Sequence, residues 1–361
     1  MWTLRRKREE SGNGSATALA EPEDPASGNG ADLALGEAEL AGEIERLTRE
    51  NRGHRSRVTE QRLLDLRHQL GIRRLGANDQ ARHPEPDVAA LPSLEAGLPE
   101  ISAGDVTPEL LRAGILRDGC LLVRGLISRD AALGFAAQID RSFAEREAHD
   151  TGTPPAGGYY EEFHPRPGSG EPIAREWIKM GGGVLACDTP MLTFEMMEMF
   201  EAAGVPPLVR GYLGEAPLIS AQKTTLRKAD PSIPGAWHQD GAFMGQVRAL
   251  NLWLSLSRCG DESPGLDIVP RRLDDFASAG TDEAMLDYQV SQRTAEAAAG
   301  DRPIIRPIFE PGDALFFDDL FLHKTGSDPS MPKPRYAIEN WFFGGSAFPV
   351  AYAPIAVECR G

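Results

Sequence analysis

The sequence predicts a mainly β fold with flanking helices, and two observations support this prediction. Residues 249–257 (ALNLWLSLS) alternate strictly between leucine and other side chains, and residues 334–343 (PRYAIENWFF) alternate similarly, as strands beside a core do. The 361 residues include 38 Gly and 28 Pro, which is above ordinary usage and favours many turns. Several such strands from about residue 218 onward predict an antiparallel sandwich or barrel.

The chain divides into four predicted parts. Residues 1–32 carry almost no large apolar side chain, so they cannot offset the entropy of ordering and are expected to form a disordered tail. Residues 33–74 are expected to be helical. Residues 75–100, with four prolines, are a predicted linker. The main domain is expected to span residues 101–361.

The predicted helical part carries an apolar seam. Residues at alternating three- and four-residue steps make up this seam: Leu40, Ile44, Leu47, Asn51 and Val58. The pattern fits two arrangements. One is an amphipathic helix that leans on the main domain, and the other is a short coiled coil that self-associates through residues 33–70.

The first elements of the main domain follow from capping signals. Thr107 is a predicted N-cap, and Gly119 is a predicted stop for the helix between them. Residues 120–127 (CLLVRGLI) read as a short strand, and Ser128 can cap a second helix. Residues 151–183 are rich in Gly and Pro yet aromatic, so we interpret them as a lid over a site.

Charge and cysteine content exclude several classes of protein. With 38 Lys+Arg against 54 Asp+Glu, the formal charge of −16 argues against a nucleic-acid or anionic-membrane binder, since either surface would repel the chain. The four cysteines form no C-x-x-C pair, so neither a disulfide framework nor a cysteine zinc site is expected. No membrane span or signal peptide is evident, so we expect a cytoplasmic protein.

Two segments far apart in the chain combine into a candidate metal site. His238 and Asp240 are separated by one residue, so on a strand both side chains would project from one face. His323 follows 85 residues later, beyond an apolar strand introduced by a Pro-Gly-Asp turn. Two imidazoles and one carboxylate leave three adjacent metal positions open, as in non-haem Fe(II) oxygenases. An isolated H-x-D pattern, by contrast, usually binds nothing.

An arginine downstream adds weight to the metal site. Arg335 opens the alternating strand of residues 335–343, and an inward-facing guanidinium there suits bidentate capture of a carboxylate. With these pieces in order, the chain resembles the Fe(II)- and 2-oxoglutarate-dependent dioxygenases of the phytanoyl-CoA dioxygenase type from about residue 106 to 348. The resemblance is strongest in WHQD, NLWLSLS with SPGLDIVP, EPGDALFFDDLFLHKTGS and KPRYAIENWFF.

The resemblance implies a double-stranded β-helix core (jelly roll, cupin-like) and a set of site residues. His238, Asp240 and His323 would hold Fe(II), while Arg335 and Thr325 would bind the distal carboxylate of 2-oxoglutarate. The other end of 2-oxoglutarate would meet one residue of the strand before the iron motif, where the candidates are Gln222, Lys223, Thr224 and Thr225. Strand parity pairs Lys223 with Thr225.

The resemblance does not fix the structural role of two positions. Trp253 stands where family members place an aromatic residue beside the co-substrate, and plain core packing explains it equally well. After residues 268–270 (IVP), relatives continue with a Gly-Ser-His turn, whereas this chain has Arg271, Arg272 and Leu273. This loop therefore departs from the family pattern, and the metal site is not affected.

The expected function is a dioxygenase that uses O2 to couple 2-oxoglutarate decarboxylation to hydroxylation of a small molecule. Asp240 favours hydroxylation or another oxidation, because halogenating relatives replace this carboxylate by a small residue. A metal-binding jelly roll without oxygenase activity and a scaffold acting through its N-terminal helix remain alternatives. The substrate is open: the aromatic and basic side chains of residues 151–183 suit an amphipathic anion, or they pack on one another.

Overall fold

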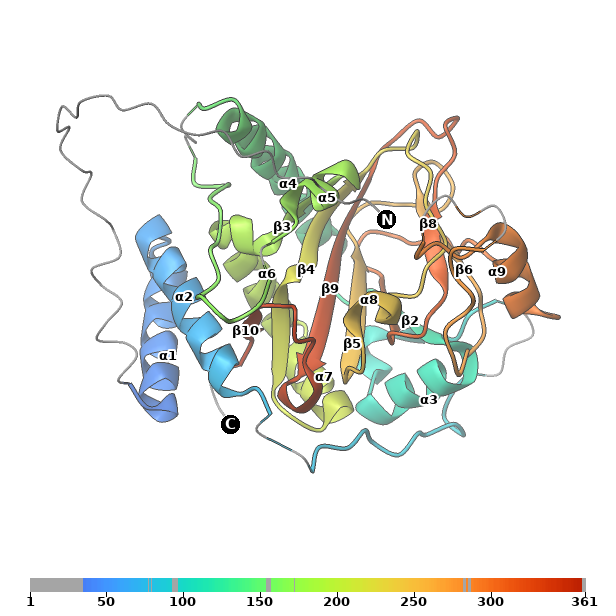
Figure 1. The fold of residues 1–361 in the computed structure, drawn as a ribbon, viewed down its shortest axis with the longest axis horizontal. Coiled ribbons are helices and arrows are strands. Elements are labelled where there is room, and N and C mark those ends of the chain that lie inside the picture. Colours follow the sequence, from blue (N-terminus) through green and yellow to red (C-terminus); the bar gives the residue numbers. More distant parts are fainter. Residues whose placement is uncertain are drawn as a thin grey trace, which may run out of the picture. The chain divides into compact units, whose positions relative to one another are not determined.

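A large sheet carries most of the chain in the computed structural model, which describes residues 35–76, 78, 80–92, 97–153, 157–171, 173–281, 284 and 287–358. The predicted tail, residues 1–32, lies outside the described residues. The helices and strands of the described residues belong to one compact unit that begins at Glu37. Figure 1 shows this unit with most of its helices and strands labelled.

Among the described residues, eight strands form the large sheet, in the order β1-β2-β7-β5-β9-β4-β10, with β3 pairing with β4. Their bounds are β1 Glu100–Ser102, β2 Cys120–Arg124, β3 Gly183–Leu185, β4 Pro217–Ala229, β5 Ala249–Ser255, β7 Ala314–Phe317, β9 Arg335–Gly344 and β10 Pro354–Ala356. All neighbours are antiparallel except β1 and β2. The strands β6 (Gly265–Ile268) and β8 (His323–Gly326) form a small second sheet.

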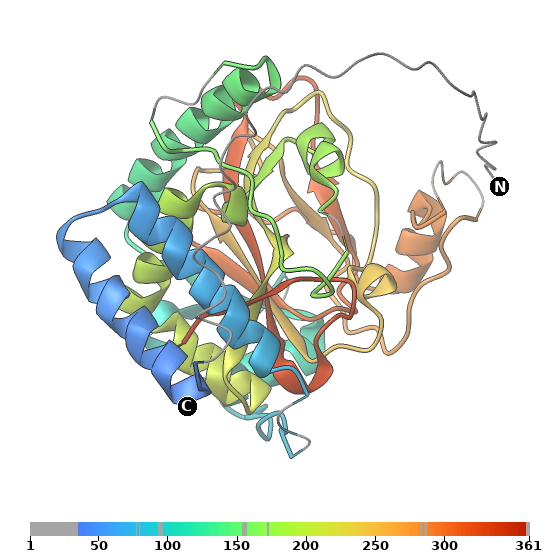
Figure 2. The same cartoon turned by 60° about the vertical axis from the view of Figure 1, so that its left-hand side comes forward.

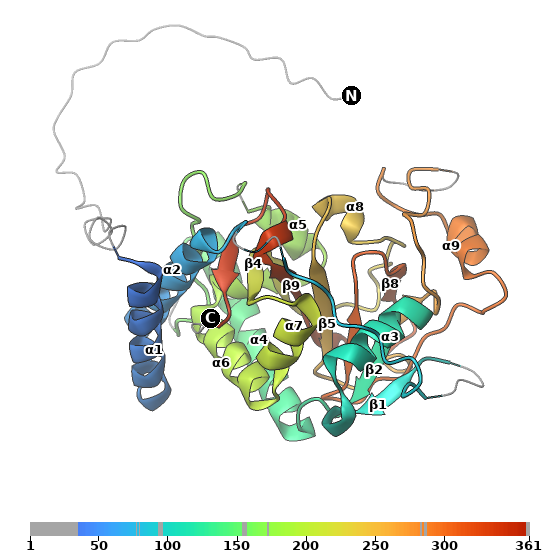
Figure 3. The same ribbon diagram turned by 90° about the horizontal axis from the view of Figure 1, so that it is seen from below.

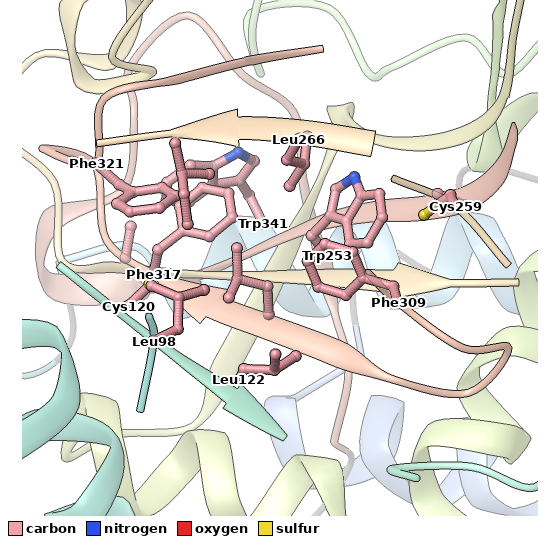
Figure 4. Close-up of a cluster of buried hydrophobic side chains, with 14 of the residues drawn as sticks. Leu98, Cys120, Leu122, Trp253, Cys259, Leu266, Phe309, Phe317, Phe321 and Trp341 are labelled. Atoms are coloured by element: carbon pink, nitrogen blue, oxygen red, sulfur yellow. The ribbon is translucent and has the colours of Figure 1, made fainter. Parts of the chain in front are cut away.

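The core lies between the two sheets. Leu266 of the small sheet belongs to the same buried cluster as Trp253, Phe317 and Trp341 of the large sheet. Figure 4 shows these side chains filling one interior. The mainly β, jelly-roll fold with flanking helices that the sequence predicts is therefore confirmed.

Helices cover the outer face of the large sheet. Helix α3 (Pro108–Asp118) packs on β2 and β7, and α7 (Val205–Leu213) packs on β4, β5 and β9 (Figure 3). Strand β5 is consequently buried along its whole length, although its sequence alternates. Its leucines face the helices, and its other side chains face the interior, because the strand lies in a sheet covered on both faces.

The predicted helix caps are present. Thr107 Oγ1 accepts a hydrogen bond from the Leu110 amide at 3.2 Å, and α3 ends at Gly119, whose φ of 85° favours glycine. Ser128 caps α4 (Arg129–Asp150) in the same way through the Ala131 amide. The other described helices after residue 100 are α5 Arg175–Met180, α6 Pro190–Ala202, α8 Gly241–Met244, α9 Gln292–Ala299 and the 3-10 turns η3 Ala103–Asp105, η4 Ala186–Asp188 and η5 Gly345–Ala347.

The region before residue 75 forms two helices, α1 (Glu37–Gly53) and α2 (Arg57–Arg73), which lie side by side (Figure 2). The first four seam residues are buried, but Val58 is 75% exposed. The seam ends early because the chain turns at residues 54–56. Helix α2 packs on β10 and α6, so these helices lean on the strands of the main domain; self-association through residues 33–70 stays a prediction.

No described helix is long and apolar enough to cross a membrane. Cys120, Cys187 and Cys259 are free and buried, and burial raises the pKa of each thiol. Cys359 lies outside the described residues.

Candidate metal centre and its carboxylate pocket

His238 and His323 lie opposite one another on two paired segments. The His238 amide donates to the His323 carbonyl at 3.0 Å, and the His323 amide donates to the His238 carbonyl at 3.1 Å. His323 also opens β8 and pairs with Ile268 of β6. The two imidazole ring centres are 4.5 Å apart. Strand pairing therefore brings together two residues that are 85 positions apart in the sequence.

Backbone hydrogen bonds orient both imidazoles. His238 Nδ1 lies 2.8 Å from the Ala236 carbonyl oxygen, and His323 Nδ1 lies 3.1 Å from the Phe321 carbonyl oxygen. Since a carbonyl only accepts, each Nδ1 must carry the proton to make this bond. Each Nε2 is then left with a lone pair for a metal ion.

Asp240 completes the site from a position that the sequence argument described wrongly. The residue is not on a strand: its φ and ψ of −62° and −30° are helical, and it directly precedes α8. The carboxylate still reaches the imidazoles, with Oδ2 at 3.9 Å from His323 Nε2. One ligand atom from each of His238, Asp240 and His323 lies within 4.8 Å of the others. The three predicted ligands are therefore brought together.

Electrostatics put the ligands in the protonation states that a metal needs. Burial alone would raise the pKa of Asp240, but Lys223 and the two imidazoles together hold that pKa well below its usual range. Lys223 Nζ donates to Asp240 Oδ1 at 2.9 Å. Burial, followed by the neighbouring His238, lowers the pKa of His323 to about 4. At neutral pH Asp240 is ionised and His323 is neutral, as metal ligands must be.

Arg335 is a fully buried cation at the start of β9. Its Nη1 donates to the Gly265 carbonyl at 3.0 Å, and its Nη2 lies 3.5 Å from Glu339 Oε1. Burial lowers its pKa, although a guanidinium stays charged at any ordinary pH. Within the described part of the chain, Arg335 Nε has no hydrogen-bond partner.

Trp253 lies over this guanidinium, with the Arg335 Cζ atom 5.3 Å from its ring centre. It also packs on Phe309 at a ring distance of 4.8 Å, so it is a core residue that contacts the buried guanidinium. Its indole Nε1 is buried without a hydrogen-bond partner among the described residues. The sequence offered packing and co-substrate contact as alternatives, and the geometry permits both.

The other predicted pocket residues lie on facing strands. Lys223 and Thr225 belong to β4, where Thr225 is opposite Glu339 of β9. Thr325 lies on β8 of the small sheet, opposite Leu266. Of the four candidates for the near end of the co-substrate, Lys223 is the one that contacts the carboxylate of Asp240.

Two charged residues of the pocket were missed at the level of sequence. Arg227 Nη2 donates to Glu339 Oε2 at 2.7 Å, and Glu339 also lies beside Arg335. Strand parity could have found both, because Arg227 is two residues after Thr225 and Glu339 is four residues after Arg335. Each therefore faces the same side of the sheet as its predicted neighbour.

Two cationic side chains of residues 151–183, the segment interpreted as a lid, pair with carboxylates of the same chain. Arg175 Nε donates to Asp188 Oδ2 at 2.8 Å, and Lys179 pairs with Asp150. Residues 154–156 and 172 of this segment lie outside the described residues. Trp177 is 52% exposed and touches Tyr288 edge-on at 5.9 Å. Trp177 is therefore the exposed aromatic side chain of this segment, whereas Tyr160 is buried.

No family model matches the sequence, and none of the curated proteins matches it. Among solved structures, EctD from S. alaskensis with 2-oxoglutarate and 5-hydroxyectoine is 15% identical, with a TM-score of 0.46, covering 74% of this chain and 84% of its own. The same protein with bound Fe is 16% identical (TM-score 0.46; 78% and 95% covered). AviO1 from Streptomyces viridochromogenes Tue57 is 17% identical (TM-score 0.40; 65% and 94% covered). Likeness at this level identifies no activity.

Proposed function

We propose that this chain is a non-haem iron dioxygenase of the phytanoyl-CoA dioxygenase type. It would couple 2-oxoglutarate decarboxylation to hydroxylation of an unactivated C–H bond in a small molecule, in the cytoplasm. The observation that carries the proposal is the combination of a two-histidine, one-carboxylate cluster with a buried guanidinium, Arg335, which donates to Gly265 of β6, the strand that pairs with the His323 strand.

The donor set fits iron(II) better than a structural zinc ion. Structural zinc sites close the metal with four protein ligands, whereas the cluster offers three. It is also the one such cluster of His, Cys, Asp and Glu among the described residues. Two imidazole nitrogens and one carboxylate leave room for a chelating co-substrate and O2.

The pocket fits a dicarboxylic 2-oxo acid. Lys223 stands next to the cluster and would meet the carboxylate nearest the metal. Arg335, with Thr325, would take the distal carboxylate, and Trp253 and Thr225 would line the space between. Arg335 Nε and Trp253 Nε1 have no hydrogen-bond partner among the described residues, so they could donate to an acceptor that a ligand supplies.

Iron(II), 2-oxoglutarate and O2 together supply the oxidising chemistry, with succinate and CO2 as products. The chain's own residues hold and orient these reactants. His238 and His323 are fixed by backbone hydrogen bonds, Lys223 and Arg335 would fix the two ends of the co-acid, and the apolar cluster around Trp253 keeps bulk water out. Since Asp240 supplies a carboxylate ligand, we propose oxygen insertion and not halogenation.

A binding titration followed by a turnover assay tests this function. Adding 2-oxoglutarate to the anaerobic Fe(II) protein should produce a visible charge-transfer absorption, and exposure to O2 should release succinate. Asp240→Ala should lose both signals. A protein that binds Fe(II) but shows no 2-oxoglutarate signal would instead be a metal-binding jelly roll without oxygenase activity, and the proposal would be wrong.

A further inference from the structure

We propose that Glu339 is an internal counter-ion that competes with the co-substrate carboxylate for Arg335, and that Arg227 holds Glu339 aside so that the co-substrate carboxylate can bind. The inference rests on the proposed function and concerns the same pocket. It assigns to Glu339 and Arg227 the role of positioning residues that set the affinity for the co-acid.

Strand register brings the three charges together. On β9, Arg335 and Glu339 flank Ala337 on the interior face, and on β4, Arg227 is directly opposite Ala337. The small side chain of Ala337 leaves the space above it to its neighbours. The Arg227, Arg335 and Glu339 side chains therefore converge over one position of the sheet, with Glu339 in contact with both guanidinium groups.

The two contacts of Glu339 are unequal. Its Oε2 accepts from Arg227 at 2.7 Å, a strong charge-assisted bond, whereas its Oε1 lies 3.5 Å from Arg335 Nη2, at the outer limit of a hydrogen bond. Arg335 is fully buried and has one short bond, to the Gly265 carbonyl. Burying a cation with so few partners costs free energy. Glu339 partly offsets the charge of Arg335 but leaves some of the guanidinium N–H groups without a partner among the described residues.

An incoming carboxylate changes this balance. Arg227, Arg335 and Glu339 carry a net charge of +1, and an external carboxylate at Arg335 brings the group to zero. The same carboxylate would lie beside Glu339, and two neighbouring negative charges repel each other. Arg227 relieves that repulsion because it keeps the stronger bond to Glu339, and a second bond to the Gly181 carbonyl at 2.7 Å anchors it.

The two residues therefore have opposite effects on affinity. Removing the charge of Glu339 leaves Arg335 free for the co-acid, so binding should tighten. Removing Arg227 while Glu339 is present leaves Glu339 to compete at Arg335, so binding should weaken. In the Glu339→Gln background, the loss of Arg227 should change the affinity for the co-acid only slightly. A residue with a merely structural role would not give this dependence on its neighbour.

The test measures the dissociation constant of 2-oxoglutarate by calorimetry on the full chain loaded with Mn(II), where no turnover occurs. We expect Glu339→Gln to bind about tenfold more tightly and Arg227→Gln about tenfold more weakly, while in the double variant the second substitution changes affinity by less than about threefold. Arg227→Lys should recover part of the loss. Glu262→Gln, which removes an exposed partner of Lys333, is the matched control.

The outcomes separate the two proposals. If wild type binds 2-oxoglutarate and Glu339→Gln binds it equally or more weakly, the counter-ion role is wrong and the proposed function stands. If Arg227→Gln weakens binding equally in both backgrounds, Arg227 has a structural role only. If neither wild type nor Glu339→Gln binds 2-oxoglutarate, both proposals fail. Should Glu339→Gln not fold, Glu339→Asp, which is too short to reach Arg335, carries the same expectation of tighter binding.

Discussion

His238 and His323 exchange both of their backbone hydrogen bonds, at 3.0 and 3.1 Å, although 85 residues separate them. The distance between the two imidazoles is thus set by a pair of strand segments, and not by the flexible ends of loops. A site built on paired strands holds its ligands more precisely than a site built on loops. The third ligand, Asp240, lies outside this bridge, in helical backbone that directly precedes α8.

Gln239 anchors the backbone next to Asp240. Its buried side chain donates to the Leu320 carbonyl at 2.7 Å and accepts from the Ala277 amide at 2.7 Å. We expect Gln239→Met to lower the free energy of unfolding by about 2 kcal/mol, because both backbone groups lose a partner. Mn(II) affinity should fall about tenfold, as for other residues that orient a ligand.

Calorimetry with Mn(II) and denaturant unfolding measure the two effects of Gln239→Met. Gln138→Met is a suitable control, because Gln138 bonds only to side chains, Glu195 and Tyr159, away from the metal cluster. A variant that loses stability but keeps full metal affinity would show that Gln239 does not orient Asp240.

Lys223 should affect the co-acid and the metal in opposite directions. Its ammonium group lies 2.9 Å from Asp240 Oδ1, so it repels a metal cation and attracts a carboxylate. In Lys223→Met we expect 2-oxoglutarate to bind at least about tenfold more weakly, since a charge-assisted bond is lost. Mn(II) should bind as tightly as in wild type or more tightly.

Separate titrations of Mn(II) and 2-oxoglutarate distinguish these effects, with Lys333→Met as the control for an exposed lysine. If metal affinity fell in parallel with 2-oxoglutarate affinity, Lys223 would serve mainly to orient Asp240, and its assignment to the co-acid would be wrong.

The residue types of the pocket could be predicted from the sequence, but their partners could not. Spacing and alternation placed His238, His323 and Arg335 on interior faces. The pairing of Arg227 with Glu339 depends on how β4 is aligned with β9, and that register shifts between Ile219 and Thr224. A shift of this kind leaves no signal in a single sequence, because alternation fixes the face of a residue and not its neighbour across the sheet.

The end of the first helix shows a second limit of the same kind. A seam at helical spacing predicts a helix, but Val58 lies outside the buried face because the chain turns at residues 54–56. The burial of α2 then depends on β10, which lies near the other end of the chain. Contacts between such distant segments cannot be inferred from local periodicity.

Gly71 provides a test of the contact between α2 and β10. A Cβ atom at this position would lie 2.9 Å from the Pro354 backbone carbonyl, which cannot move aside as a flexible side chain could. We expect Gly71→Ala to lower the free energy of unfolding by about 1–3 kcal/mol through overpacking. Gly42→Ala in α1, where nothing lies within 4 Å of the new atom, should raise it by up to about 1 kcal/mol.

Urea or guanidinium unfolding measures the change in unfolding free energy for both glycine variants. Because the substitution is identical and both sites are helical, intrinsic helix propensity cancels in the comparison. Equal stabilisation of the two variants would mean that α2 does not lie against β10.

His83, on the segment between α2 and β1, should make the protein sensitive to acid. Its Nδ1 lies 2.9 Å from the Tyr212 carbonyl oxygen, and burial, followed by the nearby Arg112 and Arg248, lowers its pKa to about 4. In the unfolded chain the pKa returns to about 6.5. Between these values the unfolded state binds more protons than the folded state, so stability falls as the pH drops from about 6.5 to 4 and is unaffected above this range.

The variant His83→Asn isolates this contribution, because its amide can still donate to the Tyr212 carbonyl but does not titrate. After allowance for the partial exposure of the ring, we expect the wild type to lose about 1 kcal/mol more than the variant between pH 7 and pH 4. Unfolding free energies of both proteins across this range provide the measurement. Parallel curves would mean that the His83 ring is as accessible to protons in the folded chain as in the unfolded one.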